Sequence, residues 1–247
     1  MYQFTSESVS QGHPDKVADL ISDTVATYLI NGNINHRAAV ETLVTTNKVI
    51  LAGEFKSDRG QNPDRIENIV REVIKEIGYE QEGFHWETVE VQNHLHGQSE
   101  DIALGTDDFG AGDQGIMFGY ACEEAGNKLP LPLFYSHELL KKLQILRKND
   151  PNYTWLEPDN KAQFTFNYGS DGKPIDIANV VCSTQHKENV DLEFVREGVK
   201  EVIQDVAGEY LTTDTNFLIN PTGRFVIGGP DGDTGLTGRK IIVDTYG

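Results

Sequence analysis

The 247-residue sequence has few cysteines, no long apolar run and no block of basic residues. Its two cysteines, Cys122 and Cys182, form no CxxC pair, so we expect two reduced thiols of an intracellular protein, not a disulfide framework. No apolar stretch reaches the ~18 residues of a membrane-spanning helix. The first ten residues, MYQFTSESVS, lack the basic and apolar regions of a secretory signal. A cytoplasmic protein without membrane association is therefore predicted.

Positive charge is also scarce, with 21 Lys and Arg against 39 Asp and Glu and a net charge of −18. A nucleic-acid partner is not expected, because such surfaces need a basic face. Binding of a polyphosphate remains compatible with this composition. It would need a few cations gathered in one cleft, with divalent metals supplying further positive charge.

Hydrophobic periodicity predicts an α-β-β-α-β order for the first hundred residues. Apolar residues at helical spacing indicate a helix over 14–30, with Pro14 in its first turn and Gly32 after its end. Strands are expected at 38–46, 48–55 and 87–92. A second helix is expected at 63–77, with Asn62 as its N-cap and Gly78 after its last turn.

The second half predicts the same order again. A glycine-rich, acidic stretch at 97–115 reads as a mobile loop. A helix is expected at 136–148, a hairpin of strands at 161–168 and 175–184, a helix at 191–206 and a strand at 215–219. A final strand at 240–244 has no helix after it and suggests a third unit cut short. The predicted fold class is α+β, built from repeated two-layer units.

Residues 10–16, SQGHPDK, place a histidine, a carboxylate and a lysine around the start of a helix. Free N–H groups and the helix dipole favour anions there. The segment suits a phosphate with its metal, and the alternative is a helix cap with solvated charges. Local chemistry leaves both interpretations open.

Three long motifs point to one family. They are FTSESVSQGHPDKVAD at 4–19, GAGDQGIMFGYA at 110–121, and NPTGRFVIGGP at 220–230 followed by GDTGLTGRKIIVDTYG at 232–247. In this order they resemble the motifs of S-adenosylmethionine synthetases (methionine adenosyltransferases). Gln11 is a departure, because the family commonly has glutamate there.

The resemblance implies a pseudo-threefold arrangement of α/β units with the third unit incomplete. It divides the chain into an N-terminal domain (1–97), a mobile active-site loop (98–108), a central domain (109–228) and the start of a C-terminal domain (229–247). The loop is shorter than in many bacterial members, which would affect closure and water exclusion. The alternative for the loop is a connector with no gating role.

The resemblance also implies the reaction. The methionine sulfur attacks C5′ of ATP and displaces tripolyphosphate, which is hydrolysed to phosphate and diphosphate, with two Mg²⁺ and one K⁺ assisting. The sulfur needs no base, so alignment and stabilisation of the leaving polyphosphate carry the catalysis. Carried over by position, the ATP-binding residues are His13, Asp159, Lys161, Arg224, Phe225, Asp233, Arg239 and Lys240.

His13, Lys161, Arg239 and Lys240 are expected on the phosphates and, with Asp113, form the catalytic set. The remaining positions face methionine or metal: Glu54, Gln98, Asp113 and Asp233 for methionine, Asp15 for Mg²⁺, and Glu41 for K⁺. Glu41 is expected to be a buried mid-strand carboxylate that needs a cation, unless it forms a salt bridge to Arg37 or another base. Purely structural roles would make Lys161 an edge-strand lysine, Phe225 a core residue, and Arg239 and Lys240 solvated charges.

In the family, a glycine-rich segment with lysines and a second Mg²⁺ ligand follows the TYG at 245–247. Without it, the alternative function is a non-catalytic fragment that dimerises or binds ATP weakly. A general ATP hydrolase is a weaker candidate, because the sequence has no Walker A pattern and no kinase motif set. The resemblance further implies a homodimer or a dimer of dimers.

Overall fold

The computed structural model describes residues 1–99 and 114–247. The chain forms two compact units: unit 1 comprises Met1–His13, Tyr120–Gly229 and Lys240–Gly247, and unit 2 comprises Pro14–Gly119 and Pro230–Arg239. Each unit has its own hydrophobic core and its own mixed sheet. In the described ranges, no helix combines the length and apolar character needed to span a bilayer.

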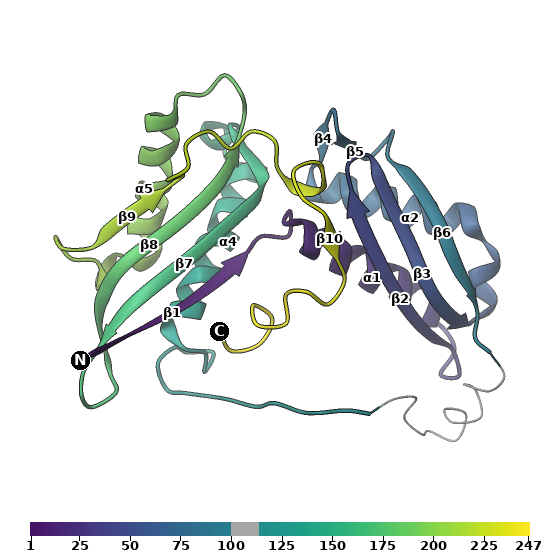
Figure 1. The fold of residues 1–247 in the computed structure, drawn as a ribbon, viewed down its shortest axis with the longest axis horizontal. Coiled ribbons are helices and arrows are strands. Elements are labelled where there is room, and N and C mark those ends of the chain that lie inside the picture. The colour runs from purple at the N-terminus through teal and green to yellow at the C-terminus, as the bar shows by residue number, and fades with distance from the viewer. Residues whose placement is uncertain (100–113) are drawn as a thin grey trace. The chain divides into compact units, whose positions relative to one another are not determined.

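Unit 2 contains a four-stranded sheet in the order β10-β2-β3-β6 (Figure 1). Its main elements are α1 (Pro14–Ile30), β2 (Arg37–Thr45), β3 (Lys48–Lys56), α2 (Pro63–Ile77), β6 (Glu90–Gly97) and β10 (Gly235–Leu236). A small hairpin, β4 (Glu80–Gln81) with β5 (Phe84–His85), lies between α2 and β6 in the chain. Strands β2 and β3 are antiparallel, whereas β3 and β6 are parallel and connected through α2.

Unit 1 repeats this topology with a sheet in the order β1-β7-β8-β9. Its elements are β1 (Tyr2–Val9), α4 (Leu131–Asn149), β7 (Leu156–Tyr168), β8 (Pro174–His186), α5 (Leu192–Ala207) and β9 (Asn216–Ile219). Strands β7 and β8 form the antiparallel pair, and α5 leads to β9, which is parallel to β8. The repeated α-β-β-α-β order predicted from the sequence is therefore confirmed within each unit.

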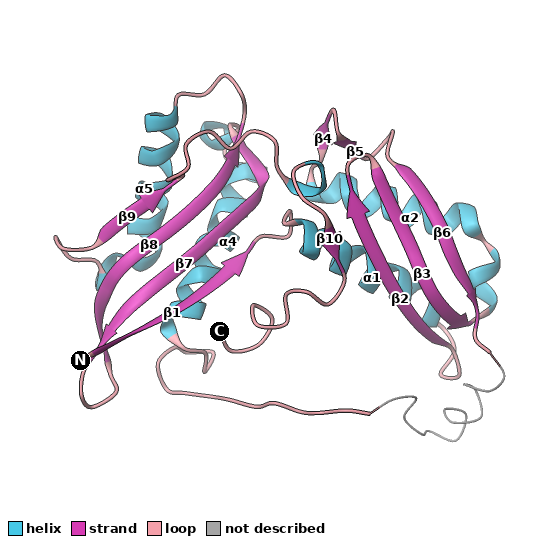
Figure 2. Ribbon diagram, in the orientation of Figure 1, coloured by secondary structure: helices cyan, strands magenta, loops and turns pink. Residues whose placement is uncertain are grey.

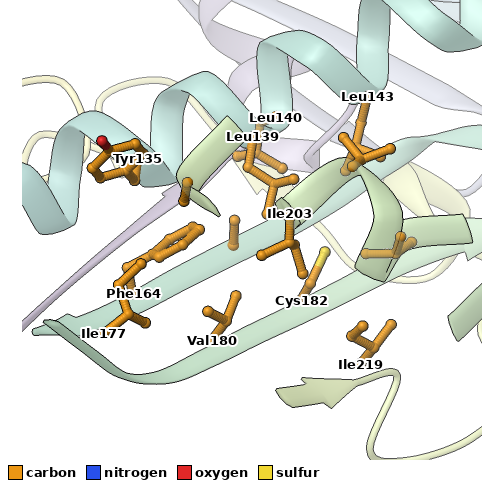
Figure 3. Packing of buried hydrophobic residues seen from close by; sticks show 14 of the residues in the cluster. Tyr135, Leu139, Leu140, Leu143, Phe164, Ile177, Val180, Cys182, Ile203 and Ile219 are labelled. Atoms are coloured by element: carbon orange, nitrogen blue, oxygen red, sulfur yellow. The ribbon is translucent and has the colours of Figure 1, made fainter. Parts of the chain in front are cut away.

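Both units have two layers, with the helices on one face of each sheet (Figure 2). Along β2 the buried residues alternate as Val40, Thr42 and Val44, and they face the apolar stripes of α1 and α2. In unit 1, α4 and α5 place leucine, valine and isoleucine against the inner face of β7 and β8 (Figure 3). Each large apolar side chain buried in this way contributes about 1.5–3 kcal/mol.

The predicted helix boundaries are close to the observed ones. The α1 helix spans the predicted range, and α2 begins after Asn62, whose side chain accepts from the Arg65 N–H at 3.1 Å. Gly78 ends α2 in the left-handed region at φ 103°. The α4 helix starts earlier than predicted, because Pro132 falls in its first turn, where no intrahelical N–H is required.

Two strands near the sheet edges differ from the prediction. The strand predicted at 87–92 begins later, at Glu90, because Arg71 occupies the carbonyls of Trp86, Glu87 and Val89. The strand β1 was not predicted, and it pairs with β7 in unit 1 over eight residues. Such long-range contacts lie outside what local periodicity reports.

The prediction of a strand at 240–244 is wrong. This segment forms turns, with the Asp244 N–H donating to the Lys240 carbonyl at 3.0 Å. Ile241 and Ile242 are each 62% exposed, and only Val243 is buried. In the described part of the chain no strand pairs with this segment, so alternation alone did not produce a strand.

Candidate functional site

The predicted site residues fall in both units. Unit 1 holds His13, Asp159, Lys161, Arg224, Phe225 and Lys240. Unit 2 holds Asp15, Glu41, Glu54, Gln98, Asp233 and Arg239. Asp113 and most of the predicted loop at 98–108 lie outside the described residues.

In unit 1, the loop that carries His13 is fastened to the start of β7. The Ser10 hydroxyl donates to the Pro158 carbonyl at 2.7 Å and accepts from the Asn160 N–H at 2.9 Å, and the Ser10 N–H donates to the Asn160 carbonyl at 2.8 Å. Gly12 lies so close that a Cβ there would be 2.3 Å from the Pro158 carbonyl oxygen. The contact places the His13 backbone beside the segment that carries Asp159 and Lys161.

Asp159 is buried at 3% exposure and connects β7 to the 220–229 segment. Its carboxylate oxygen Oδ2 accepts from the Gly229 N–H at 2.9 Å, and its own N–H donates to Gln185 Oε1 at 3.2 Å. Gln185 in turn donates from Nε2 to the Val226 carbonyl at 2.8 Å. One glutamine at the end of β8 therefore positions both Asp159 and the segment carrying Arg224 and Phe225.

His186 is a positioning residue that the sequence analysis missed. The backbone N–H of His186 donates to the Phe225 carbonyl at 2.9 Å, and the backbone N–H of Phe225 donates to ring Nε2 of His186 at 3.2 Å. Ring Nδ1 lies 2.9 Å from the Lys187 carbonyl, which can only accept, so Nδ1 carries the proton and Nε2 the lone pair. The ring thus holds the backbone of Phe225. The predicted strand ended at residue 184, two residues before His186, so the sequence analysis gave this histidine no role.

Two of the predicted cationic residues of unit 1, Lys161 and Arg224, are exposed. Lys161 is exposed on β7, a central strand with β1 and β8 on either side, so the edge-strand interpretation does not apply. Arg224 is exposed and pairs with Glu188 through Nη2 and Oε1 at 2.5 Å. Phe225 is half-buried, and Lys240 is half-buried in the C-terminal turns.

In unit 2, the 234–238 segment is tied to α1. Asp15, in the first turn of α1, is 2% exposed, and its Oδ1 accepts from the Leu236 N–H at 2.9 Å. Arg239 Nε lies 3.7 Å from the same oxygen. One turn later, Asp19 Oδ1 accepts from the Gly238 N–H at 2.9 Å. The structure therefore brings the predicted metal ligand Asp15 together with the predicted phosphate ligand Arg239.

Three hydroxyl groups add a second connection that the sequence analysis missed. Ser22 Oγ lies 2.7 Å from both Thr42 Oγ1 and Thr237 Oγ1, and the Thr42 N–H donates to Thr237 Oγ1 at 2.8 Å. The bonds link α1, β2 and the segment just before Arg239. Because they satisfy polar groups that packing removes from water, they hold that segment in place.

The prediction that Glu41 is buried is wrong in this chain. Glu41 is exposed, because Val40, Thr42 and Val44 occupy the helix-facing side of β2 and Glu41 points to the opposite face of the sheet. Within residues 1–99 and 114–247, Glu41 takes part in no ion pair, so the predicted salt bridge is not observed either. Its role as a K⁺ ligand stays a prediction.

The predicted methionine residues of unit 2 lie at separate positions. Glu54 is half-buried on β3, opposite Ala39 of β2 and His96 of β6. Gln98 follows β6, and its N–H donates to the Phe55 carbonyl at 2.9 Å. Asp233 is exposed and caps its own turn by accepting from the Thr234 N–H at 2.8 Å. Register thus places Glu54 and Gln98 at one end of the sheet.

A metal ion bound by protein alone does not fit the described residues, since no three His, Cys, Asp or Glu side chains gather there. A single buried carboxylate does fit Mg²⁺ that arrives with a nucleotide, because Mg²⁺ takes one or two carboxylates plus phosphate oxygens and water. Asp15, the predicted Mg²⁺ ligand, is a buried carboxylate of this kind, and its Oδ1 accepts from the Leu236 N–H. Its role as a metal ligand stays a prediction.

Comparison with known families matches three successive parts of the chain. The profiles are those of the N-terminal domain (residues 1–100), central domain (108–225) and C-terminal domain (227–247) of S-adenosylmethionine synthetase. Among curated proteins, the chain is 53% identical over 252 residues to the S-adenosylmethionine synthase of Rhodospirillum centenum and 54% identical over 253 residues to that of Granulibacter bethesdensis. Each alignment covers 100% of this chain and 64% of the relative.

Proposed function

Because the chain belongs to the S-adenosylmethionine synthetase family, we propose that it transfers the adenosyl group of ATP to the sulfur of L-methionine. Tripolyphosphate is the leaving group and is hydrolysed to phosphate and diphosphate. The products are S-adenosylmethionine and these two anions. Since the chain spans 64% of the length of the relatives, the activity is a proposal for the protein as it stands.

One observation carries the proposal. The 10–13 loop is hydrogen-bonded to Pro158 and Asn160, which sets the segment of His13 against that of Asp159 and Lys161. A thioether sulfur is a nucleophile without deprotonation, so the reaction needs positioned charge more than a base. A loop held by three hydrogen bonds and close packing supplies that positioning in unit 1.

The residues of unit 1 are assigned to the nucleotide. His13 hydrogen-bonds the leaving end of the triphosphate near the ribose, Asp159 contacts the ribose or adenine side, and Lys161 and Lys240 neutralise charge on the phosphates. Phe225 stacks on adenine, and Arg224 holds the adenosine. The support is the restraint of this segment by Gln185 and His186, which fixes Phe225 before any ligand binds. A pre-positioned backbone reduces the entropy lost on binding.

The residues of unit 2 are assigned to metal, polyphosphate and methionine. Asp15 holds Mg²⁺, which neutralises phosphate charge when bound, and Arg239 binds phosphate oxygens beside it. Asp233 contacts ATP and binds the amino group of methionine, as does Glu54. Gln98 binds the carboxylate of methionine, and Asp113 faces the methionine. Glu41 binds K⁺. The exposed carboxylate of Glu41 is compatible with an ion held jointly with groups from elsewhere.

The assembly and architecture proposed with this function follow the family. We expect a cytoplasmic homodimer or dimer of dimers, with residues 229–247 beginning a third unit of a pseudo-threefold arrangement. The matching topology of the two described units supports the repeat. The second candidate function is a non-catalytic chain that dimerises or binds ATP weakly, and the activity test below distinguishes it from the first.

The test is to incubate the chain with ATP, methionine, Mg²⁺ and K⁺ and to separate S-adenosylmethionine, phosphate, diphosphate and tripolyphosphate by ion-exchange chromatography. Formation of S-adenosylmethionine supports the proposal. Phosphate release without methionine would indicate a hydrolase. No product, with dimers by light scattering, would support the non-catalytic candidate.

Variants test the assignments individually. Asp15→Asn keeps an oxygen for the Leu236 N–H but loses charge, so it should raise the Mg²⁺ concentration for half-maximal activity about tenfold, whereas Asp23→Asn on the exposed side of α1 should not. Glu41→Gln should abolish activation by K⁺. His13→Ala should slow adenosyl transfer more than hydrolysis of added tripolyphosphate. Unchanged Mg²⁺ dependence in Asp15→Asn would argue against Asp15 as a Mg²⁺ ligand, and retained K⁺ activation in Glu41→Gln would argue against Glu41 as the K⁺ ligand. Equal slowing of both reactions in His13→Ala would argue against the proposed position of His13.

A further inference from the structure

Two carboxylates of α1 bind the main chain just before Arg239. Asp15 and Asp19 are four residues apart, so they lie on the same face of the helix. Asp15 Oδ1 accepts from the Leu236 N–H at 2.9 Å. Asp19 Oδ1 accepts from the Gly238 N–H, also at 2.9 Å. Asp15 is the predicted metal ligand, whereas Asp19 has no role in the proposed function and restrains the residue that directly precedes Arg239.

Contacts on two sides of this segment fix its path within unit 2. A Cβ at Gly235 would lie 2.1 Å from the Pro14 carbonyl oxygen, so the chain touches the backbone of α1 there. The Thr237 N–H donates to the Thr42 carbonyl at 3.1 Å, which ties the segment to β2. Thr237 Oγ1 also lies 2.7 Å from Ser22 Oγ of α1. The segment is therefore held at successive residues by α1 and by the neighbouring strand.

Gly238 lies in a turn at the end of this held segment. Its φ is +76°, in the left-handed region that favours glycine, and no described atom lies within 4 Å of a Cβ built on it. Because glycine is conformationally permissive, the bond from Asp19 restrains a backbone that would otherwise move. The next side chain, that of Arg239, is 55% exposed, and its Nε lies 3.7 Å from Asp15 Oδ1. A shift of the Gly238 backbone would carry this guanidinium away from Asp15.

We propose that Asp19 is a positioning residue that sets the place of the Arg239 guanidinium on the polyphosphate, an inference that rests on the proposed function. Asp19 acts as an acceptor for a main-chain N–H and does not itself touch the phosphates. The alternative role is an ion pair with Lys16, whose Nζ lies 3.1 Å from Asp19 Oδ2. In an ion pair the charge of Asp19 matters, whereas in the proposed role its acceptor oxygen matters.

The first test measures binding of tripolyphosphate in the presence of Mg²⁺ by isothermal titration calorimetry on the intact chain. Asp19→Ala removes the acceptor and should weaken binding about tenfold, equivalent to about 1.4 kcal/mol. Electrostatics alone predicts the opposite sign, because the loss of a carboxylate favours a nearby polyanion. Asp19→Asn keeps an acceptor for the Gly238 N–H and should bind within about twofold of the wild type. Asp23→Ala, at an exposed carboxylate of α1, is the matched control and should change the affinity less than about twofold.

A double-mutant cycle shows whether Asp19 acts through Arg239. Arg239→Gln should weaken binding by about tenfold, because it removes a charge-assisted contact to phosphate. In that background Asp19→Ala should change the affinity less than about twofold, since no guanidinium remains to be misplaced. An equal loss in both backgrounds, or equal losses for Asp19→Ala and Asp19→Asn, would overturn the inference.

The same titrations separate this inference from the proposed function. If the wild-type chain does not bind tripolyphosphate with Mg²⁺, the proposed phosphate site is wrong and the inference falls with it. If Arg239→Gln weakens binding and Asp19→Ala does not, the inference alone is wrong.

Thr237→Val takes the place of Asp19→Ala if urea denaturation shows that Asp19→Ala does not fold. Valine keeps the shape of threonine but loses the hydroxyl bonds to Ser22 and to the Thr42 N–H. It should weaken binding about threefold in the wild-type background and leave the affinity of Arg239→Gln unchanged. Equal weakening in the two backgrounds would again overturn the inference.

Discussion

Gly12 offers a direct test of how the His13 loop is positioned. A Cβ at this residue would lie 2.3 Å from the Pro158 carbonyl oxygen, 2.4 Å from its carbon and 2.6 Å from its Cβ. Gly12 does not have a positive φ, so the effect of Gly12→Ala is steric and not conformational. Backbone atoms of β7 cannot rotate away, and the loop itself must move.

The expected magnitude follows from what that movement disturbs. Inserting a methyl group into a packed contact costs about 1–3 kcal/mol. Moving the loop also strains the bonds of Ser10 to Pro158 and Asn160, each of which contributes about 0.5–1.5 kcal/mol. We expect the free energy of unfolding of unit 1 to fall by about 2–4 kcal/mol, which lowers its melting temperature by on the order of 10 °C.

Tryptophan fluorescence can follow unit 1 separately. Trp155 lies buried in unit 1, and the other tryptophan, Trp86, lies in unit 2. In a Trp86→Phe background, urea denaturation of Gly12→Ala monitored by Trp155 emission gives the loss in unit 1. Isothermal titration with ATP and Mg²⁺ on the same protein should show weaker binding, because the His13 backbone no longer sits beside Asp159.

Gly208→Ala is the matched control. Gly208 has φ −54°, and no described atom lies within 4 Å of a Cβ built on it. This change should leave stability unchanged or raise it slightly, since alanine restricts the unfolded chain. A loss for Gly12→Ala within about 0.5 kcal/mol of the control would refute the argument that close packing holds the loop.

Three further predictions concern other parts of the chain. Gly53→Ala should destabilise unit 2 by about 3 kcal/mol or more, because Gly53 has φ 124° and a Cβ would lie 2.1 Å from the Ala39 carbonyl oxygen. A loss of free energy of unfolding below about 1 kcal/mol, measured by urea denaturation, would contradict this prediction. Arg71→Lys should lower the free energy of unfolding by about 2 kcal/mol, because lysine cannot reach the carbonyls of Trp86, Glu87 and Val89 together. The control Arg65→Lys, at an exposed arginine, should change the free energy of unfolding little. Equal melting temperatures of the two variants would argue against this role of Arg71. Ellman's reagent should modify Cys122 in the native protein and Cys182 only after unfolding, because burial raises the pKa of the Cys182 thiol from 9.0 to about 11. Between pH 9 and about 11 the thiol of Cys182 is deprotonated in the unfolded chain but not in the folded one, so stability should fall as the pH rises above 9. Rapid reaction of both cysteines with Ellman's reagent in the native protein would contradict the burial of Cys182.

Much of the fold could be read from local sequence. Helical spacing and capping located α1 and α2, with Asn62 and Gly78 at the ends of α2, because these signals act within a few residues. The β7–β8 hairpin followed from its glycine turn. The strand predicted at 240–244 failed because alternation describes a face and does not supply a partner, and its isoleucines stay exposed.

Sequence alone was enough to identify the family, since long ordered motifs specify residue identities that composition cannot. The same resemblance predicts which residues bind nucleotide, methionine and metal, and the structure describes all of these residues except Asp113. Which of these residues meet depends on the tertiary structure. Asp15 contacts Arg239 from the opposite end of the chain, and Phe225 is held by His186. Such contacts arise from strand pairing and close packing between distant segments, and the exposure of Glu41 likewise depends on which sheet face the helices cover. Local sequence patterns carry no information on contacts between distant segments or on which face of a sheet the helices cover.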